Sequence, residues 1–150
     1  MEYRQANRND VAAFVENRLE FSALFVADAE MDAFRNRTKR YLEEHIDRDD
    51  LMVFLAVDDG RIVSSCMACL FLTAPLPSCP TGKSATLLNV YTLEAYRRQG
   101  HAETIVRMLI ERLREADVDR VLLDYTDLGL PLYRKLGFVE REKQMHLRLR

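Results

Sequence analysis

A segment that could bind an anion lies at residues 92–102, Thr-Leu-Glu-Ala-Tyr-Arg-Arg-Gln-Gly-His-Ala. It joins an expected strand to the start of the most regular amphipathic helix pattern in the chain. The free N–H groups of a first helical turn point outward together, and the helix dipole adds partial positive charge. Gly100 lets the backbone approach a ligand closely, and Arg97 and Arg98 add full charges. These residues predict a pyrophosphate site, although an ordinary capped helix with exposed arginines would use the same ones.

A second segment with chemical potential is Leu132-Tyr133-Arg134-Lys135-Leu136-Gly137-Phe138, which follows an expected buried strand. Two interpretations of its tyrosine stay open. Tyr133 is either a core aromatic of a short amphipathic turn, or a phenol held over a cleft at the end of that strand.

Other suggestive residues do not complete a site. Thr81-Gly82-Lys83-Ser84 contains the Gly-Lys-Ser of a phosphate loop, but the glycine required five residues before Gly82 is Pro77. Cys66 and Cys69 have CxxC spacing inside an expected strand, where they would face opposite sides. No second cysteine pair or histidine pair accompanies them, so we expect core cysteines and no metal. The three histidines are too far apart to suggest a joint site: His45, His101 and His146.

Hydrophobic periodicity predicts the elements that position the two segments. Asn7 and Asp10 can form a capping box before a first helix. A second helix is expected after Asp28, and Gly137 should end the last one. Asp-Asp-Gly at 58–60, between two apolar runs, predicts a hairpin. The expected strands are 2–6, 51–57, 61–72, 85–93, 121–123 (within the segment 119–126) and 145–149, and the expected helices are 11–25, 31–46, 102–113 and 128–136.

Composition limits the partners. The 150 residues are enough for one domain, residues 1–150, and carry a net charge of −2. This balance argues against DNA, RNA or an anionic membrane held by bulk positive charge. No apolar run approaches the roughly 20 residues of a membrane helix, and the first residues lack the apolar core of a signal peptide. Three cysteines in a chain of this size indicate a reduced, cytoplasmic protein.

Together the two segments resemble the GNAT superfamily of acyl-CoA N-acyltransferases. Arg97-x-x-Gly100-x-Ala102 matches its acyl-CoA signature (Arg or Gln, two residues, Gly, one residue, Gly or Ala), and Leu132-Tyr133-x-x-x-Gly137-Phe138, about thirty residues later, is similar to its second motif. The resemblance implies an α/β (α+β) fold of order β-α-α-β-β-β-α-β-α-β. Its mixed, mostly antiparallel sheet would splay between the fourth and fifth strands, with CoA in the gap.

The resemblance also implies residue roles. The backbone at Val90, Tyr91 and Thr92 would run along the pantetheine arm, and the Thr92 N–H would polarise the thioester carbonyl. Tyr133 would be the general acid that protonates the departing thiolate. The other cofactor-binding residues would be Arg97, Arg98, Gln99, Gly100, His101 and Ala102 at the pyrophosphate, and Thr126, where many relatives have asparagine.

The chain departs from the family pattern at the general base. Thr86 stands where many relatives have an acid in the fourth strand, which leaves Glu94, Asp124 and Asp127 as local carboxylates and the base unassigned. In the family the acceptor site is commonly walled by the first helices and the loop before the fourth strand. Here those parts contain Phe21, Phe25, Asp28, Glu30, Asp32 and the loop Pro75–Pro80.

The resemblance implies an N-acetyltransferase that uses acetyl-CoA as cosubstrate and needs no metal, and we expect it in the cytoplasm. The acids favour a cationic amine, and a small primary amine is favoured over a protein lysine, although capping explains the same acids. A homodimer stays open. The alternative function is a catalytically weak acyl-CoA-binding sensor or interaction domain of the same fold, suggested by Thr86. A nucleic-acid-binding module is disfavoured by the charge and by the lack of an aromatic–basic motif.

Overall fold

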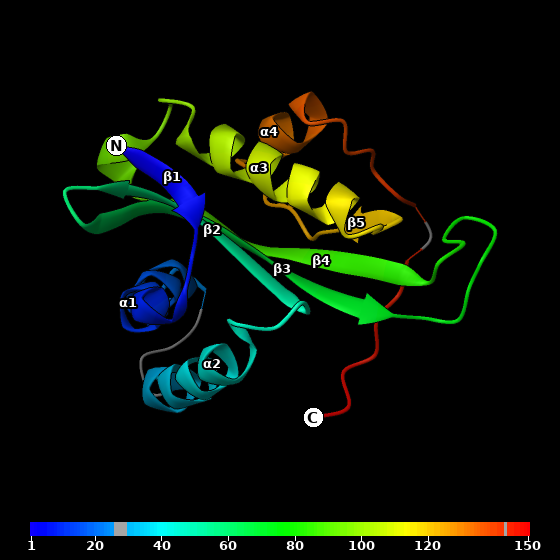
Figure 1. Ribbon diagram of the computed structural model, residues 1–150, viewed down its shortest axis with the longest axis horizontal. Helices are drawn as coiled ribbons and strands as arrows, with labels where there is room; N and C mark the ends of the chain where they lie inside the picture. The colour runs from blue at the N-terminus through cyan, green and yellow to red at the C-terminus, as the bar shows by residue number, and fades with distance from the viewer. Residues whose placement is uncertain (26–29, 143) are drawn as a thin grey trace.

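The computed structural model describes residues 1–25, 30–142 and 144–150. Its sheet has the strand order β1-β2-β3-β4-β5 (Figure 1). Neighbouring strands run antiparallel from β1 to β4, whereas β5 runs parallel to β4. The strands are β1 (Glu2–Gln5), β2 (Leu51–Asp58), β3 (Arg61–Leu72), β4 (Lys83–Thr92) and β5 (Arg120–Leu122).

Helices cover both faces of this sheet. α1 (Val11–Ser22) and α2 (Met31–His45) pack on one face. α3 (His101–Glu115) packs on the other face, and α4 (Leu130–Lys135) lies on the same side of the sheet as α3 (Figure 1). The sequence of β2 is a continuous apolar run because the strand is buried on both faces. Leu55 packs beneath α1, while Phe54 and Ala56 pack beneath α3. Because both faces are buried, neither set of alternating residues can be polar.

β4 is only partly paired with β5. The parallel pairing covers Ser84 to Thr86, although β4 continues to Thr92. Beyond this pairing, Asn89 has a positive φ of 53°, and the register with β3 shifts between Ser65 and Met67. Such a bulge bends the strand that carries it. The second half of β4 therefore diverges from β5 and leaves one edge of its backbone free, as the fold class implied by the resemblance requires.

The turn and the helix end that were predicted from local sequence signals are present in the structure. Asp59 and Gly60, with φ values of 45° and 78°, turn β2 into β3, which confirms the hairpin. Two consecutive positive φ values are typical of the tight turns that match strand twist. Gly137, with φ 92°, follows α4 as the expected terminator. The α/β fold class, with a mixed sheet open between β4 and β5, is confirmed.

Two expectations were wrong. α1 ends at Ser22 and not near Phe25. The strand expected at 121–123, by contrast, is present with a shift of one residue, as Arg120–Leu122. The expected strand at 145–149 does not form in the described residues 144–150. Its apolar side chains are almost fully exposed, at 99% for Met145, 82% for Leu147 and 85% for Leu149. Alternation predicts a strand only where another strand edge lies alongside, and no described strand pairs with this segment. Asp28, after which we expected the second helix to begin, lies outside the described residues.

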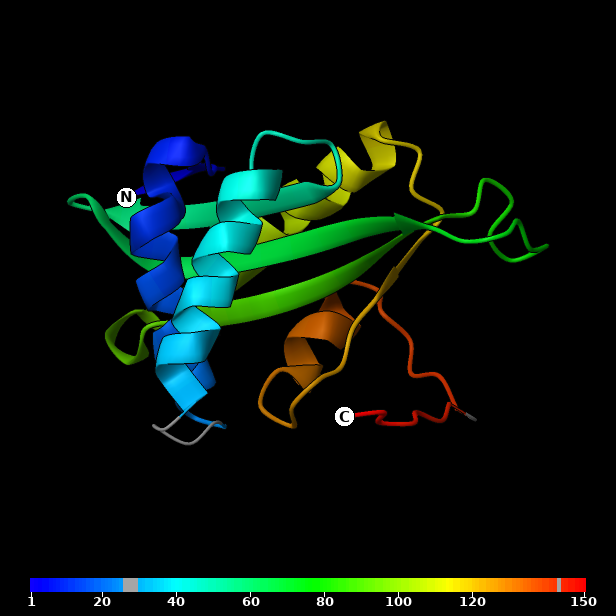
Figure 2. The same cartoon turned by 90° about the horizontal axis from the view of Figure 1, so that it is seen from below.

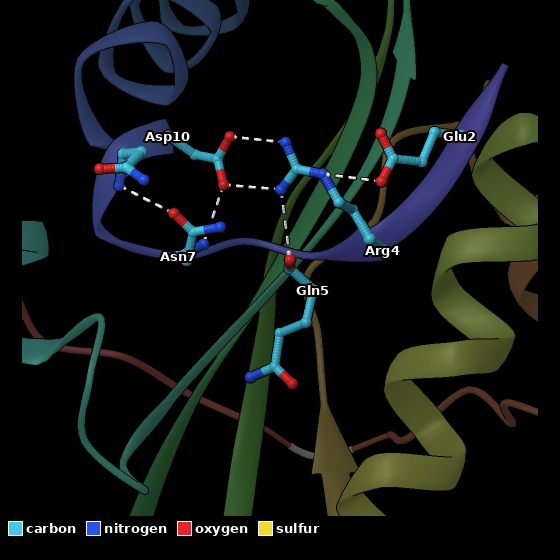
Figure 3. A network of polar contacts seen from close by, with 6 residues as sticks. Glu2, Arg4, Gln5, Asn7 and Asp10 are labelled. Atoms are coloured by element: carbon cyan, nitrogen blue, oxygen red, sulfur yellow. Dashed lines mark hydrogen bonds and ion pairs between the residues drawn. The ribbon is translucent and has the colours of Figure 1, made fainter.

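The predicted capping box is present at the start of the helical region. The Asn7 side chain accepts a hydrogen bond from the Asn9 N–H at 2.9 Å, and the Asp10 carboxylate accepts one from the Asn7 N–H at 2.9 Å (Figure 3). Asp10 also binds the Arg4 guanidinium through two hydrogen bonds of 2.7 and 2.8 Å. The Arg4 hydrogen bonds are the largest of the interactions that lower the pKa of Asp10 below its ordinary value. The network thus links β1 to the first helical turn.

Asp10→Asn is expected to lower the free energy of unfolding by about 1 kcal/mol at pH 7, because it removes a charged cap and one partner of an ion pair. The lowered pKa means that the carboxylate stabilises the fold above the unfolded pKa of about 4, and that this contribution is lost as pH falls through the folded pKa. Urea denaturation at pH 7 and pH 3 should therefore show a deficit that shrinks at the lower pH. Asp47→Asn, at an exposed pair with Arg8, is the control and should change little. An equal deficit at both pH values would exclude the charge-based explanation.

Candidate active site

A cavity of about 520 Å³ opens where β4 separates from β5. Its walls come from the end of α1, the second half of β4, the start of α3, and the chain from the end of β5 to α4. Figure 2 shows the chain diverging from β4 after β5, with α4 beside the β4 edge of the sheet. The volume lies in the range of small-molecule and cofactor sites.

One end of the cavity is suited to an anion. α3 begins at His101, and its N-cap residue Gly100 has a positive φ of 85° and no side-chain cap. Nothing lies within 4 Å of where a Cβ on Gly100 would be, so a ligand can approach the backbone there. Arg97 and Arg98 line the cavity beside this helix terminus. Free N–H groups, the helix dipole and two guanidinium groups together make this end electropositive.

His101 and Gln99 have side-chain partners within the protein. His101 is buried, and its Nδ1 lies 2.8 Å from the Tyr3 hydroxyl, which attaches the start of α3 to β1. The Gln99 side chain donates to the Ala95 carbonyl at 3.1 Å, and Gln99 does not line the cavity. Apart from the candidate bases, all the other residues to which the resemblance gave a role do line it: Val90, Tyr91, Thr92, Arg97, Arg98, Gly100, His101, Ala102, Thr126 and Tyr133.

The free edge of β4 offers backbone groups to the cavity. The Leu93 N–H donates to the Val63 carbonyl of β3 at 2.9 Å. Because backbone groups of successive strand residues point to opposite edges, the N–H and C=O of Thr92 point away from β3, into the gap. The Thr92 carbonyl accepts a hydrogen bond from Arg97 Nε at 3.1 Å, in agreement with this direction. The Thr92 N–H is therefore positioned to donate to a carbonyl oxygen in the cavity.

Tyr133 contributes a phenol to the same cavity. Its ring is 8% exposed and packs edge-on against Phe138, with the centroids 5.8 Å apart. Its hydroxyl forms no hydrogen bond with any residue that the structure describes. Burial, followed by the nearby Cys66 thiol, raises the pKa of Tyr133 to about 12. The phenol thus keeps its proton throughout the neutral range, as a proton donor must.

The three candidate carboxylates differ in whether they reach the cavity. Asp124 lines the cavity, whereas Glu94 and Asp127 do not. Glu103 also lines it, but accepts hydrogen bonds from Lys135 at 2.5 Å and Arg107 at 2.9 Å. Asp124 forms no ion pair with any described residue and is exposed. Thr86 lies within the paired part of β4, opposite Leu122 of β5, and does not face the cavity.

The other end of the cavity is apolar. Phe21 and Phe25 line it, as suggested from the sequence, but Glu30, Asp32 and the described loop Pro75–Pro80 do not. The loop instead projects from the distal end of β3 and β4 (Figure 1). That expectation was wrong because the loop leaves the sheet at the end where β4 is still paired with β5. Asp28 lies outside the described residues. Sequence reasoning missed further residues that line the cavity: Leu24, Leu88, Asn89 and Leu128.

Of these, only Asn89 carried a usable sequence signal. Asparagine adopts positive φ more readily than other non-glycine residues, and here it interrupts an expected strand. The three leucines carried none, since apolar residues in a helix, strand or loop are usually core residues.

The rejected motifs have structural roles. Thr81 donates twice to Asp119, from its N–H and its hydroxyl at 2.7 Å each, and so joins the β3–β4 loop to the start of β5. Cys66 is buried beneath α3, while Cys69 packs on the opposite face with Tyr41. Within the described ranges no group of His, Cys, Asp or Glu side chains could hold a metal ion. No helix in those ranges is long and apolar enough to cross a membrane.

Comparison with known proteins agrees with this geometry. Residues 18–138 match the model of the acetyltransferase (GNAT) family. A "predicted acetyltransferase" from Clostridium acetobutylicum, solved with acetyl-CoA, has a TM-score of 0.86 at 21% identity and covers 99% of this chain and 96% of its own. Glucosamine-6-phosphate N-acetyltransferase from Arabidopsis thaliana has a TM-score of 0.75 at 16% identity, with complete coverage of both chains.

A curated relative is also similar in sequence. Glucosamine 6-phosphate N-acetyltransferase from Trypanosoma brucei brucei is 34% identical over 99 residues. The match spans 65% of this chain and 64% of the relative, which is slightly less than two thirds of that protein's length.

Proposed function

The chain belongs to the acetyltransferase (GNAT) family, and on this premise we propose that it transfers an acetyl group from acetyl-CoA to a primary amine. The observation that carries the proposal is one cavity that joins a helix N-terminus with two arginines, a free strand edge and a buried tyrosine. These are the parts needed to bind a pyrophosphate, polarise a thioester and protonate a thiolate.

In the proposed complex the described residues fit acetyl-CoA in three places. The start of α3, with Arg97 and Arg98, would bind the pyrophosphate. The free edge at Val90 and Thr92 would run along the pantetheine arm, and Thr126 lies on the opposite wall. Acetyl-CoA supplies the acyl group as an activated thioester.

The proposed reaction is a direct transfer. The neutral amine attacks the thioester carbon, so that a C–N bond forms and the C–S bond breaks. The Thr92 N–H would stabilise the negative charge on the carbonyl oxygen. Tyr133 would give its proton to the departing thiolate, and Asp124 would receive the amine's proton through water. Because the amine attacks directly, no nucleophilic side chain is needed.

A small primary amine fits the cavity better than a protein lysine, because α1 and the chain before α4 wall it from both sides. The two relatives named as glucosamine-6-phosphate N-acetyltransferases also support a small acceptor, because the amine in their names is a small molecule. The proposal includes a cytoplasmic location, supported by three free cysteines. It also includes a homodimer, supported by the exposed apolar side chains of Met145, Leu147 and Leu149.

Thiol release tests the function. With acetyl-CoA and a library of primary amines, thiol should appear only when both substrates are present, and mass spectrometry should show the amine gaining an acetyl group. The replacement of the family acid by Thr86 favours the second candidate, an acyl-CoA sensor. Tight acetyl-CoA binding without acetylation of any amine would support the sensor and contradict the transferase.

A further inference from the structure

A continuous aromatic row leads from the cavity's mouth to the proposed transfer point. Phe25 packs edge-on against Phe21, with ring centroids 5.5 Å apart, and Phe21 lies 5.3 Å from the Tyr91 ring. Tyr91 directly precedes Thr92, whose N–H faces the gap. Because the Tyr91 hydroxyl donates to Glu20 at 3.1 Å, its ring is held in position beside Phe21. An amine reaching Thr92 from this side must pass along the row.

The end of the cavity near the C-terminus of α1 carries apolar side chains that are exposed to solvent. Leu24 is 62% exposed and Phe25 is 65% exposed, both at the end of α1. Leu128 faces the cavity from the opposite wall and is also largely exposed. Exposed apolar side chains that gather on a cavity wall indicate a binding surface for an apolar group.

Cationic side chains are few on the cavity walls. Among the described residues that line the cavity, Arg97 and Arg98 are the arginines or lysines, and Arg97 Nε already donates to the Thr92 carbonyl at 3.1 Å. Residues 26–29, Val-Ala-Asp-Ala, add no cation by their sequence. A phosphate ester carries about two negative charges at neutral pH and needs cationic or N–H partners. Apart from Arg97, the described walls on the acceptor side offer phenylalanine and leucine side chains and the Asp124 carboxylate.

We infer that the acceptor is a primary amine bearing an aromatic group, of the phenethylamine type, and not a phosphorylated amino sugar. The inference rests on the proposed function and specifies its substrate class. The ring would lie against Phe21, Phe25 and Leu24, with Leu128 covering its other side. The amine would then extend past Tyr91 toward the acyl carbon, with the Asp124 carboxylate on the facing wall.

The test compares three acceptors in the thiol-release assay: phenethylamine, ethylamine and glucosamine 6-phosphate. We expect kcat/KM for phenethylamine to exceed both others at least about 10-fold, since an apolar pocket distinguishes substrates by this factor or more. Phe25→Ala should reduce the ratio of kcat/KM for phenethylamine over ethylamine about 10-fold. Phe71→Ala, at a half-exposed phenylalanine on β3 that does not line the cavity, should leave the ratio unchanged.

The outcomes separate this inference from the proposed function. Turnover that favours glucosamine 6-phosphate, or an unchanged ratio in Phe25→Ala, overturns the inference and leaves the acetyltransferase proposal standing. Failure of every amine to be acetylated overturns both. Calorimetric titration of phenethylamine into wild type and Phe25→Ala adds a readout independent of turnover, with weaker binding expected for the variant.

Discussion

Tyr133→Phe is expected to lower kcat about 100-fold while the affinity for CoA stays unchanged. The substitution removes the hydroxyl proton that the thiolate would receive, and general acid catalysis contributes at least about this factor. It keeps the ring, so the packing against Phe138 and the cavity wall is preserved. The measurements are steady-state thiol release at saturating substrates and calorimetric titration with CoA.

Tyr125→Phe is the matched control. Tyr125 also loses only a hydroxyl, one that donates to Glu140 at 2.6 Å on the surface, and it does not line the cavity. Its kcat should equal that of wild type. A Tyr133→Phe enzyme with wild-type kcat would remove Tyr133 from the mechanism.

The raised pKa of Tyr133 gives the same proposal a pH signature. A general acid fails when it loses its proton, and a pKa of about 12 places that loss far above neutrality. In the wild type, kcat should therefore not fall between about pH 8 and 10, where an ordinary tyrosine with a pKa near 10 would begin to ionise. A decline of kcat with a midpoint in that range would show that burial does not protect the phenol.

Gly100→Ala is expected to weaken acetyl-CoA binding about 10-fold or more. The new Cβ would enter open space at the start of α3, where the pyrophosphate must approach the backbone. Losing one hydrogen bond to a charged group costs enough for such a change in Kd. Because φ is 85°, the substitution also strains the backbone, so stability falls by about 1 kcal/mol. Isothermal titration with acetyl-CoA and urea denaturation measure the two effects separately.

Gly60→Ala controls for the strain. Gly60 has a similar φ of 78° and equally open surroundings, but it lies in the β2–β3 turn, away from this cavity. Both variants should therefore lose similar stability, while only Gly100→Ala should lose affinity. Equal affinities in the two variants would contradict pyrophosphate binding at the start of α3.

Features that depend on neighbours in the sequence could be predicted from it. The Asn7–Asp10 capping box, the turn at Asp59 and Gly60, and the helix end at Gly137 each involve a few adjacent residues. Their geometry follows from local steric preference and hydrogen bonding, whatever the rest of the chain does. The spacing of Arg97, Gly100 and Ala102 is equally local. It allowed the acyl-CoA signature at the start of α3 to be identified from the sequence.

The strand expected at 145–149 shows the limit of this reasoning. Alternation in Met145, Leu147 and Leu149 records which side chains are apolar, but it does not supply a partner edge. The energy of a strand comes from the hydrogen bonds and side-chain pairs that a neighbouring strand provides. The residues are consequently exposed in this chain.

The sequence by itself determined the family, the sheet with its helices, and the segments that carry an anion site and a tyrosine. Only the tertiary structure decided which carboxylate faces the cavity, how deeply Tyr133 is buried, and that Phe21 and Tyr91, seventy residues apart, form one aromatic wall. The physical reason is strand register. A shift of one residue turns every side chain to the other face of the sheet, and the bulge at Asn89 makes such a change inside β4.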